Sequence, residues 1–177
     1  MTFAFISSHV ALDFAGTMGR WSTEQVDLLD APERLALWCE AAGVVDDRPE
    51  VGQEDLEQAR ALRAAVYRLA RASGEDSADD RRLLNAVAAV APVRLRLSDG
   101  GAAIRTGDVD AVLSTVARAA IELLTGPDRE NVRECGYETC TRLYVDHSAR
   151  RSRRWCDMKT CGNRAKAQSF RKRHANA

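Results

Sequence analysis

Several features are scarce in this chain of 177 residues. Aromatic residues make up 6% of it, and alanine and arginine dominate instead, which favours helix. No apolar run is long enough to cross a bilayer, because the longest helical stretch, residues 111–125, is interrupted by Arg118 and Glu122. The first residues have neither a basic start nor a long apolar run, which is not typical of a secretory signal. We therefore expect a cytoplasmic protein with no membrane partner.

Residue patterns that carry catalysis are also scarce. The chain has no Gly-rich loop that would cradle a phosphate, since Asp99-Gly100-Gly101 is typical of a hairpin turn. An acid–base pair of His9 and Asp13 is one interpretation, and a hydrogen-bonded pair in the core is the simpler one. We therefore expect no enzyme, with a catalytic site in the N-terminal part as the weakest alternative. The residues that we predict to line a small-molecule effector site are His9, Asp13, Thr17, Arg20 and Trp38.

Cysteine is absent from most of the chain and concentrated near its end. Four of the five cysteines form two pairs of matching spacing: Cys135 with Cys140, and Cys156 with Cys161. Two short chelating loops joined by a longer one are typical of a four-thiolate zinc site, and a closed thiolate set predicts a structural Zn²⁺. Unliganded thiols, two disulfides or His147 as a ligand are the alternatives. Cys39, which stands alone, is predicted to be a core residue.

The net charge of zero conceals a division along the chain. Residues 1–132 carry 14 Lys+Arg and 22 Asp+Glu, a net −8, whereas residues 133–177 carry 12 Lys+Arg and 4 Asp+Glu, a net +8. Such asymmetry indicates that the basic part binds an anionic partner, with docking on the acidic part as an alternative. The side chains that we predict to contact nucleic acid are Arg150, Arg151, Arg153, Arg154, Lys159, Asn163, Arg164, Lys166, Gln168 and Arg171.

Apolar periodicity and capping residues predict a mainly α fold with one β-hairpin (α+β). Helices are expected over residues 30–43, 53–73, 77–91 and 108–125, with Asp30, Ser77 or Asp79, and Asp108 at their starts. The strict alternation of residues 93–97 before the turn at 98–101 predicts the hairpin. Residues 9–17 are expected in the core, as either a short strand or a helix. The segment after Cys161 is expected to be helical, with Phe170 and Ala167 facing inward, in a treble-clef-like module.

Residues 155–166, Trp-Cys-Asp-Met-Lys-Thr-Cys-Gly-Asn-Arg-Ala-Lys, resemble the signature of the CGNR zinc-finger family. The first cysteine pair, residues 144–148 and Arg153-Arg154 also fit it. In that family the finger follows an N-terminal ABATE domain, described as a stress-induced transcription regulator. Residues 12–17 and the pattern Pro32-x-x-Leu35-x-x-Trp38 are similar to that domain, except that Gly16 stands where we expect asparagine. The resemblance implies DNA binding and transcription regulation.

These observations predict two domains: an ABATE-like helical domain over residues 1–126, a hinge over 127–133 and a CGNR-type zinc finger over 134–177. Our first hypothesis is a bacterial, stress-related transcription regulator that binds double-stranded DNA, with an N-terminal sensing or oligomerisation domain. A small single finger usually needs extra contacts for specificity, so we also expect a homodimer. The second hypothesis is a protein–protein adaptor in which the zinc module is purely structural.

Overall fold

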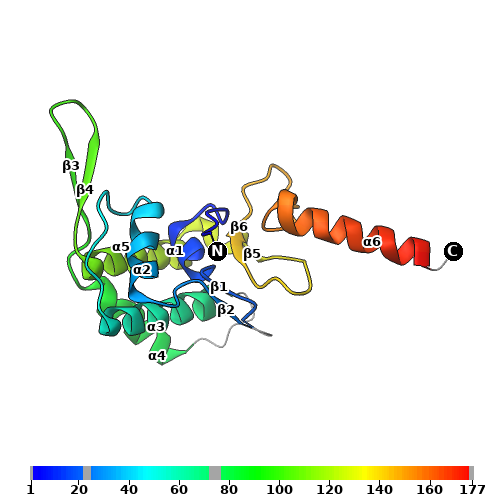
Figure 1. Cartoon of the computed structure of the whole chain (residues 1–177), viewed down its shortest axis with the longest axis horizontal. Helices are drawn as coiled ribbons and strands as arrows, with labels where there is room; N and C mark the ends of the chain where they lie inside the picture. Colours follow the sequence, from blue (N-terminus) through cyan, green and yellow to red (C-terminus); the bar gives the residue numbers. More distant parts are fainter. Residues whose placement is uncertain (1, 22–24, 72–76, 176–177) are drawn as a thin grey trace.

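The computed structural model describes residues 2–21, 25–71 and 77–175 (Figure 1). The elements, in chain order, are α1 (Val10–Ala15), β1 (Met18–Gly19), β2 (Val26–Asp27), α2 (Pro32–Ala41), α3 (Gln53–Ala70), α4 (Ala78–Ala88), β3 (Arg94–Leu97), β4 (Ala103–Thr106), α5 (Val109–Thr125), the 3-10 helix η1 (Pro127–Asn131), β5 (Val132–Glu134), β6 (Leu143–Val145), the π-helical turn η2 (Met158–Gly162) and α6 (Asn163–Ala175). The strands form three antiparallel pairs, β1–β2, β3–β4 and β5–β6. The α+β class expected from the sequence is confirmed.

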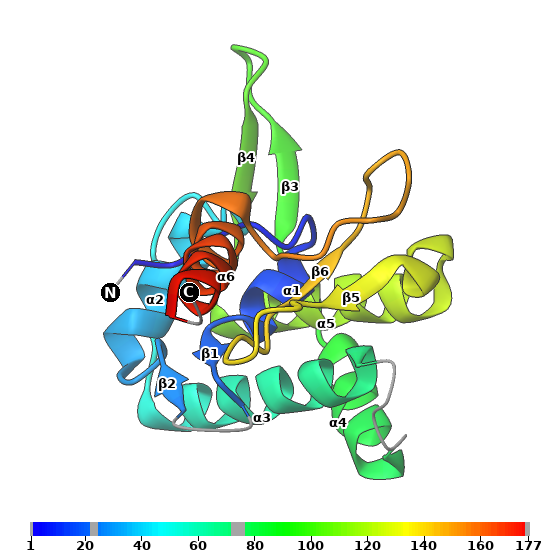
Figure 2. The ribbon, with the colours of Figure 1, turned by 90° about the vertical axis from the view of Figure 1, so that its right-hand side faces the viewer.

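The core of the body lies between α1, α3 and α5, and α2 and α4 pack against these helices (Figure 2). Within residues 9–17, for which strand and helix were both open, residues 10–15 form the short helix α1. Phe14 of α1 lies with its ring centroid 4.8 Å from that of Trp38 on α2, and both side chains are fully buried. Aromatic contacts are few, as expected, and leucine, valine and alanine form most of the core.

Two of the helices begin at the residues that the sequence indicates. The carboxylate of Asp108 accepts the backbone N–H of Ala111 at 2.9 Å, so it caps α5. The hydroxyl of Ser77 accepts the backbone N–H of Asp80 at 3.4 Å at the start of α4. The Gly126-Pro127 pair ends α5, because proline cannot continue the helix.

The ends of α2 and α3 differ slightly from the expectation. Ala31, not Asp30, is the N-cap of α2, and no side chain caps it. Pro32 begins this helix and has no N–H to satisfy, which reduces the need for a cap. Helix α3 ends at Ala70 rather than at residue 73; residues 72–76 lie outside the described part.

The predicted hairpin is present as β3–β4, with Arg94 opposite Thr106 and Leu97 opposite Ala103. It projects from the body (Figure 1), and therefore both of its faces meet solvent. Leu95 and Leu97 are 70% and 72% exposed. The alternation of apolar and polar residues in β3 therefore predicted the strand correctly, but its apolar residues are not buried.

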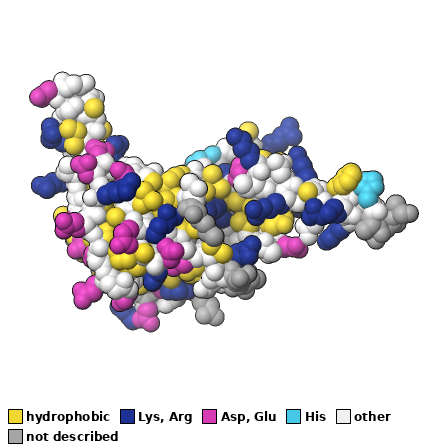
Figure 3. Space-filling model, viewed as in Figure 1, with side chains coloured by type: hydrophobic (Ala, Val, Ile, Leu, Met, Phe, Trp, Pro, Cys, Tyr) yellow, Lys and Arg dark blue, Asp and Glu magenta, His cyan; other side chains and the backbone are white. Residues whose placement is uncertain are grey.

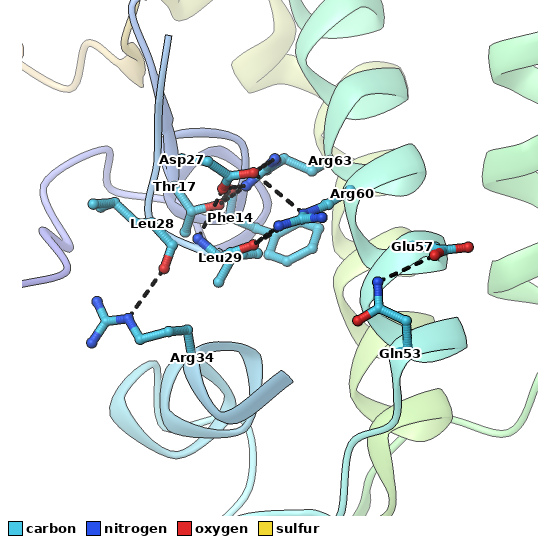
Figure 4. A network of polar contacts seen from close by, with 10 residues as sticks. All are labelled: Phe14, Thr17, Asp27, Leu28, Leu29, Arg34, Gln53, Glu57, Arg60 and Arg63. Carbon is cyan, nitrogen blue, oxygen red and sulfur yellow. Dashed lines mark hydrogen bonds and ion pairs between the residues drawn. The ribbon is translucent and has the colours of Figure 1, made fainter. Parts of the chain in front are cut away.

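A buried ion pair ties the β1–β2 region to α3 (Figure 4). Arg63 of α3 is 2% exposed and donates to both carboxylate oxygens of Asp27, at 2.6 and 2.9 Å. Arg60 lies 3.3 Å from the same carboxylate and donates to the carbonyl of Leu29 at 3.0 and 2.7 Å. Nothing in the local sequence pattern marks this pair, because its members are 36 residues apart.

The pair β5–β6 joins the C-terminal segment to the body. Val132, Leu143 and Val145 belong to the main hydrophobic core, and the backbone N–H of Val145 donates to the carbonyl of Ser7 at 2.9 Å. The residues predicted as a hinge, 127–133, form η1 and the start of β5. The division into domains at 126 and 134 stays a prediction. Within the described residues, no helix combines the length and apolar character needed to cross a membrane.

Candidate metal centre and basic surface

The four clustered cysteines come from two short turns. Cys135 follows β5 and Cys140 precedes β6, so the first pair lies in the connection of this strand pair. The backbone N–H of Cys140 donates to the carbonyl of Tyr137 at 2.8 Å, which closes the first turn. Cys161 lies in η2, at the start of the C-terminal helix, and Asp157 caps this turn by accepting the N–H of Thr160 at 3.0 Å. The last ligand therefore stands at a helix start, as in the expected module.

The four sulfur atoms form a compact cluster in which all lie within 4.8 Å of one another. The Sγ atoms of Cys140 and Cys156 are 3.8 Å apart, and those of Cys156 and Cys161 are 3.6 Å apart. A tetrahedral zinc ion with Zn–S bonds of about 2.3 Å places its sulfur ligands roughly 3.8 Å apart. The cluster therefore fits one Zn²⁺, with all four positions filled by protein, which makes the ion structural.

The close contacts between the four cysteines also shift the pKa values of their thiols. Thiol donors on Cys140 and Cys156 lower the pKa of Cys135, whereas the sulfur contacts of Cys156 with Cys135 and Cys140, together with burial, raise the pKa of Cys156. Thiolates this close repel one another, and a bound cation removes this repulsion. By contrast, burial raises the pKa of the isolated Cys39 to about 12, and this thiol lies in the core of the body as predicted. His147, the alternative ligand, is exposed and contacts Asp128 instead.

The cluster is surrounded by close-packed side chains. Trp155 packs against it, with the Arg154 guanidinium 5.2 Å from the ring centroid. A Cβ atom on Gly162 would lie 2.8 Å from Met158 Sδ and 3.2 Å from Trp155 Cδ1. Only glycine allows this close approach beside the last ligand.

Arg153 and Asp146 organise the loop that connects the two ligand pairs. Arg153 donates to the carbonyls of Trp155 (2.9 Å), Ile6 (3.1 Å) and Cys156, and its guanidinium lies 4.2 Å from the Tyr144 ring centroid. The buried Asp146 carboxylate accepts the backbone N–H groups of Ser148 and Arg153, both at 2.9 Å. A hydrogen bond from the Ser148 hydroxyl, together with these two backbone N–H groups, lowers the pKa of Asp146. Arg153 is therefore engaged inside the module, unlike its neighbours.

Arg142 joins the module to the N-terminal segment. Its guanidinium donates to the carbonyl of Ala4 at 3.1 Å and to that of Gly16 at 3.0 Å. A Cβ on Gly16 would lie 2.4 Å from Nη1 of Arg142. Glycine at position 16, where asparagine was expected, thus leaves the space that Arg142 occupies. Sequence patterns do not reveal this contact, because its partners are 126 and 138 residues away.

The other residues predicted to contact nucleic acid are mostly exposed. The exposed members are Arg150, Arg151, Arg154, Lys159, Asn163, Arg164, Lys166 and Arg171. The Asn163 amide donates to the carbonyl of Lys159 at 3.2 Å, and that of Gln168 to Glu138 at 2.8 Å. These two amides have partners within the module, so the accessible groups are chiefly arginine and lysine.

Helix α6 carries five Lys or Arg and no Asp or Glu among its 13 residues. It extends away from the body (Figure 1), and the space-filling view shows Lys and Arg along it while the acidic side chains of this face lie mostly over the body (Figure 3). Among residues 2–21, 25–71 and 77–175, no Lys or Arg of α6 forms an ion pair.

The inward orientation expected for Phe170 is wrong: this ring is 57% exposed, because no other element packs beside it.

The residues predicted to line an effector site do not gather around one cavity. Trp38 is fully buried in the core, and Thr17 donates to the carbonyl of Phe14 at 2.6 Å. Arg20 is exposed and lines a cleft of about 150 Å³ beside Cys140 and Cys161. A second cavity, of about 410 Å³, is lined by none of the five predicted residues.

His9 and Asp13 do not form a hydrogen-bonded pair, and the Asp13 carboxylate binds backbone groups instead. One carboxylate oxygen of Asp13 accepts the N–H groups of Ile6 and Ser7, both at 3.0 Å. Burial raises the pKa of Asp13 and lowers that of His9, whose Nδ1 is buried without a hydrogen-bond partner. Asp13 therefore fixes Ser7, whose carbonyl receives the N–H of Val145 from the zinc module.

Two family models match the chain and together cover most of it. Residues 8–127 match ABATE, described as "Putative stress-induced transcription regulator", and residues 131–174 match the CGNR zinc finger. No curated protein matches the chain. Both matched descriptions are of regulator and zinc-finger types, and the second agrees with the thiolate cluster seen here. The chain therefore belongs to the ABATE family and carries a C-terminal CGNR zinc finger that binds a structural Zn²⁺.

Proposed function

We propose that this protein is a bacterial, stress-related transcription regulator that acts in the cytoplasm, binds double-stranded DNA through its zinc finger and has no enzymatic activity. The single observation that carries the proposal is α6, an exposed helix with five cationic and no anionic side chains, which begins at the zinc site. Lysine and arginine supply most non-specific DNA affinity by neutralising phosphates. A helix of this kind fits the major groove, where arginine recognises guanine.

The DNA-contacting surface that we propose consists of the accessible cations around the finger: Arg150, Arg151, Arg154, Lys159, Arg164, Lys166 and Arg171. Arg153 is left out because its guanidinium is engaged by carbonyl groups. Asn163 and Gln168 would have to exchange their present partners to reach bases. The zinc ion holds the loop and the helix start in place, so we assign it a positioning role.

Zinc-loaded protein should bind mixed-sequence duplex DNA, with an affinity that falls steeply with salt. We expect a log–log slope of about −4 or steeper in fluorescence anisotropy, which corresponds to several neutralised phosphates. Arg164→Ala should weaken binding roughly five- to tenfold at 0.1 M salt and make the slope shallower by about 1, because one phosphate contact is lost. Zinc content should not change.

Arg82→Ala is the matched control, since Arg82 is an exposed arginine on α4, outside the finger. Its DNA affinity should equal that of the unmodified protein. If Arg164→Ala leaves the affinity unchanged, α6 is not the reading helix. If no binding occurs even at low salt, the protein–protein adaptor becomes the better hypothesis. The exposed apolar side chains of Met158 and Phe170 in the same module favour that alternative.

We further propose that the regulator acts as a homodimer and that its ABATE part senses an effector. A single finger contacts few base pairs, so a second copy would supply the missing specificity. Light scattering of the zinc-loaded protein should give twice the chain mass of 19.5 kDa. A mass of one chain, with and without duplex DNA, would contradict the dimer.

A further inference from the structure

A cavity lies where α3 ends, between α4, the C-terminal half of α5 and η1. Figure 2 shows these elements together at its lower right. Its volume is about 410 Å³, within the range of small-molecule sites in proteins. It is distinct from the region of His9 and Trp38 in which the sequence predicted an effector site.

One part of the cavity wall is apolar and is supplied by three helices. The side chains are Leu69 of α3, Leu84 of α4, and Ile121 and Leu124 of α5. All except Leu84 are partly exposed, so the cavity offers apolar surface that the core has not covered. An apolar group placed there would be removed from water, which is favourable in proportion to the area buried.

The other part of the wall is cationic: among residues 2–21, 25–71 and 77–175, four arginines and no acidic side chain line the cavity. Arg68 donates two hydrogen bonds to the Asp80 carboxylate, which balances the charge of the guanidinium. The Nε atom of Arg71 lies 3.3 Å from a carboxylate oxygen of Glu134, an ion pair that does not have hydrogen-bond geometry. Arg129 donates to the carbonyl of Ala70 at 2.6 Å and has no acidic partner among the described residues. Arg71 and Arg129 are thus the two cations whose N–H groups could donate hydrogen bonds to a bound anion.

We propose that this cavity binds an amphipathic anion, a small molecule with one carboxylate or similar anionic group and an apolar chain. The apolar part lies against Leu69, Leu84 and Ile121, and the anionic group lies between Arg71 and Arg129. Arginine suits this role because its planar fork of donors matches a carboxylate. This site does not depend on whether the finger binds DNA.

The position of the site connects it to the zinc finger. Arg129 lies in η1, which leads directly into β5, and Arg71 contacts Glu134, the residue before the zinc ligand Cys135. An anion bound to Arg71 competes with Glu134 for this guanidinium. Binding in the cavity therefore changes contacts at the base of the finger, which is what an effector site requires.

The test uses 8-anilinonaphthalene-1-sulfonate, a fluorescent amphipathic anion, as the probe on the full zinc-loaded chain. We expect saturable fluorescence with one site per chain, and displacement by octanoate at a concentration at least tenfold lower than that of the neutral octanamide. Equal displacement by octanamide, or no saturable binding of the probe, would overturn the proposal, because the cations would then contribute nothing.

Two variants locate the site. Arg129→Gln, which keeps a donor for the Ala70 carbonyl, should weaken octanoate binding at least fivefold, whereas Arg82→Gln on the exposed face of α4 should not. Leu124→Trp should abolish binding by filling the cavity, with helicity checked by circular dichroism. If octanoate binds the folded Leu124→Trp variant normally, the anion binds elsewhere and the proposal is wrong. DNA binding is measured separately, so failure of one proposal does not hide failure of the other.

Discussion

Cys156→Ser is expected to remove the bound zinc and to unfold most of residues 135–172, while the helical body stays folded. The four sulfur atoms lie within 4.8 Å of one another, and serine leaves only three thiolates around the ion. Loss of a partner outside the ligand set already weakens metal binding by about 10–100-fold, so loss of a ligand should exceed 100-fold. The small module folds with its metal, because zinc binding supplies free energy that its few buried residues do not.

The structure refines which residues should unfold. Leu143 and Val145 of β6 belong to the core of the body, so this strand should keep part of its protection from hydrogen exchange. Residues 146–172 depend on Cys156 and Cys161 and should lose theirs. Zinc content per chain and amide hydrogen exchange measure the two effects. Loss of protection throughout α3 and α5 would contradict the predicted division into domains.

Cys39→Ala is the matched control for this experiment. Cys39 is also buried, but it lies on α2, away from the cluster, and the pKa of about 12 for its thiol makes it a poor ligand. One zinc per chain should remain, with only a modest loss of stability. Full zinc binding by Cys156→Ser would show that the four-thiolate assignment is wrong.

The second large effect is expected from Asp27→Asn, which should lower the free energy of unfolding by about 3 kcal/mol. Asp27 pairs with Arg63, whose side chain is 2% exposed, so the variant leaves a buried guanidinium without its counter-charge. Arg60 lies nearby but bonds chiefly to the Leu29 carbonyl, and it adds a second unpaired cation. For a chain of this size the loss corresponds to a decrease in Tm of roughly 6–12 °C.

The control for Asp27 is an ion pair of similar distance on the surface. Glu40 and Arg48 are 2.5 Å apart, but both are exposed, so Glu40→Gln should change stability by less than about 1 kcal/mol. Urea denaturation of both variants measures the difference. If the two variants lose the same stability, the Asp27–Arg63 pair does not hold β2 to α3.

The same ion pair predicts a dependence of stability on pH. Burial acts to raise the pKa of Asp27, but hydrogen bonds and charge from Arg63 outweigh it and lower the pKa below the ordinary value of 3.8. A carboxylate with a lowered folded pKa stabilises the protein above its unfolded pKa, and this contribution is lost as the pH falls through the folded pKa. Below pH 3.8 the stability gap between the protein and Asp27→Asn should therefore narrow.

The zinc centre was predictable from the sequence because its information is local. Chelation needs cysteines at short, matching spacings, and Cys135-x4-Cys140 and Cys156-x4-Cys161 are visible without knowledge of the fold. The helices and the β3–β4 hairpin were predictable for the same reason, since periodicity and caps such as Asp108 act within a few residues. The sequence motifs also pointed to the ABATE and CGNR families, which the matches confirm.

The tertiary structure alone decided which polar residues are engaged and which are accessible. Arg153 and Arg154 are neighbours in a basic run, yet Arg153 is held by carbonyls of Ile6 and Trp155 while Arg154 is exposed. The cavity near Arg129 is likewise assembled from helices far apart in the chain.

Prediction from the sequence thus succeeded for features that depend on neighbouring residues: the metal ligands, the helices, the hairpin and the charge division. Only the tertiary structure decided the partners of Arg63, Arg142 and Arg153, the exposure of Phe170 and the place of the cavity. The physical reason is that hydrogen bonding and burial of a side chain depend on groups up to 147 residues away, which meet only when the chain has folded.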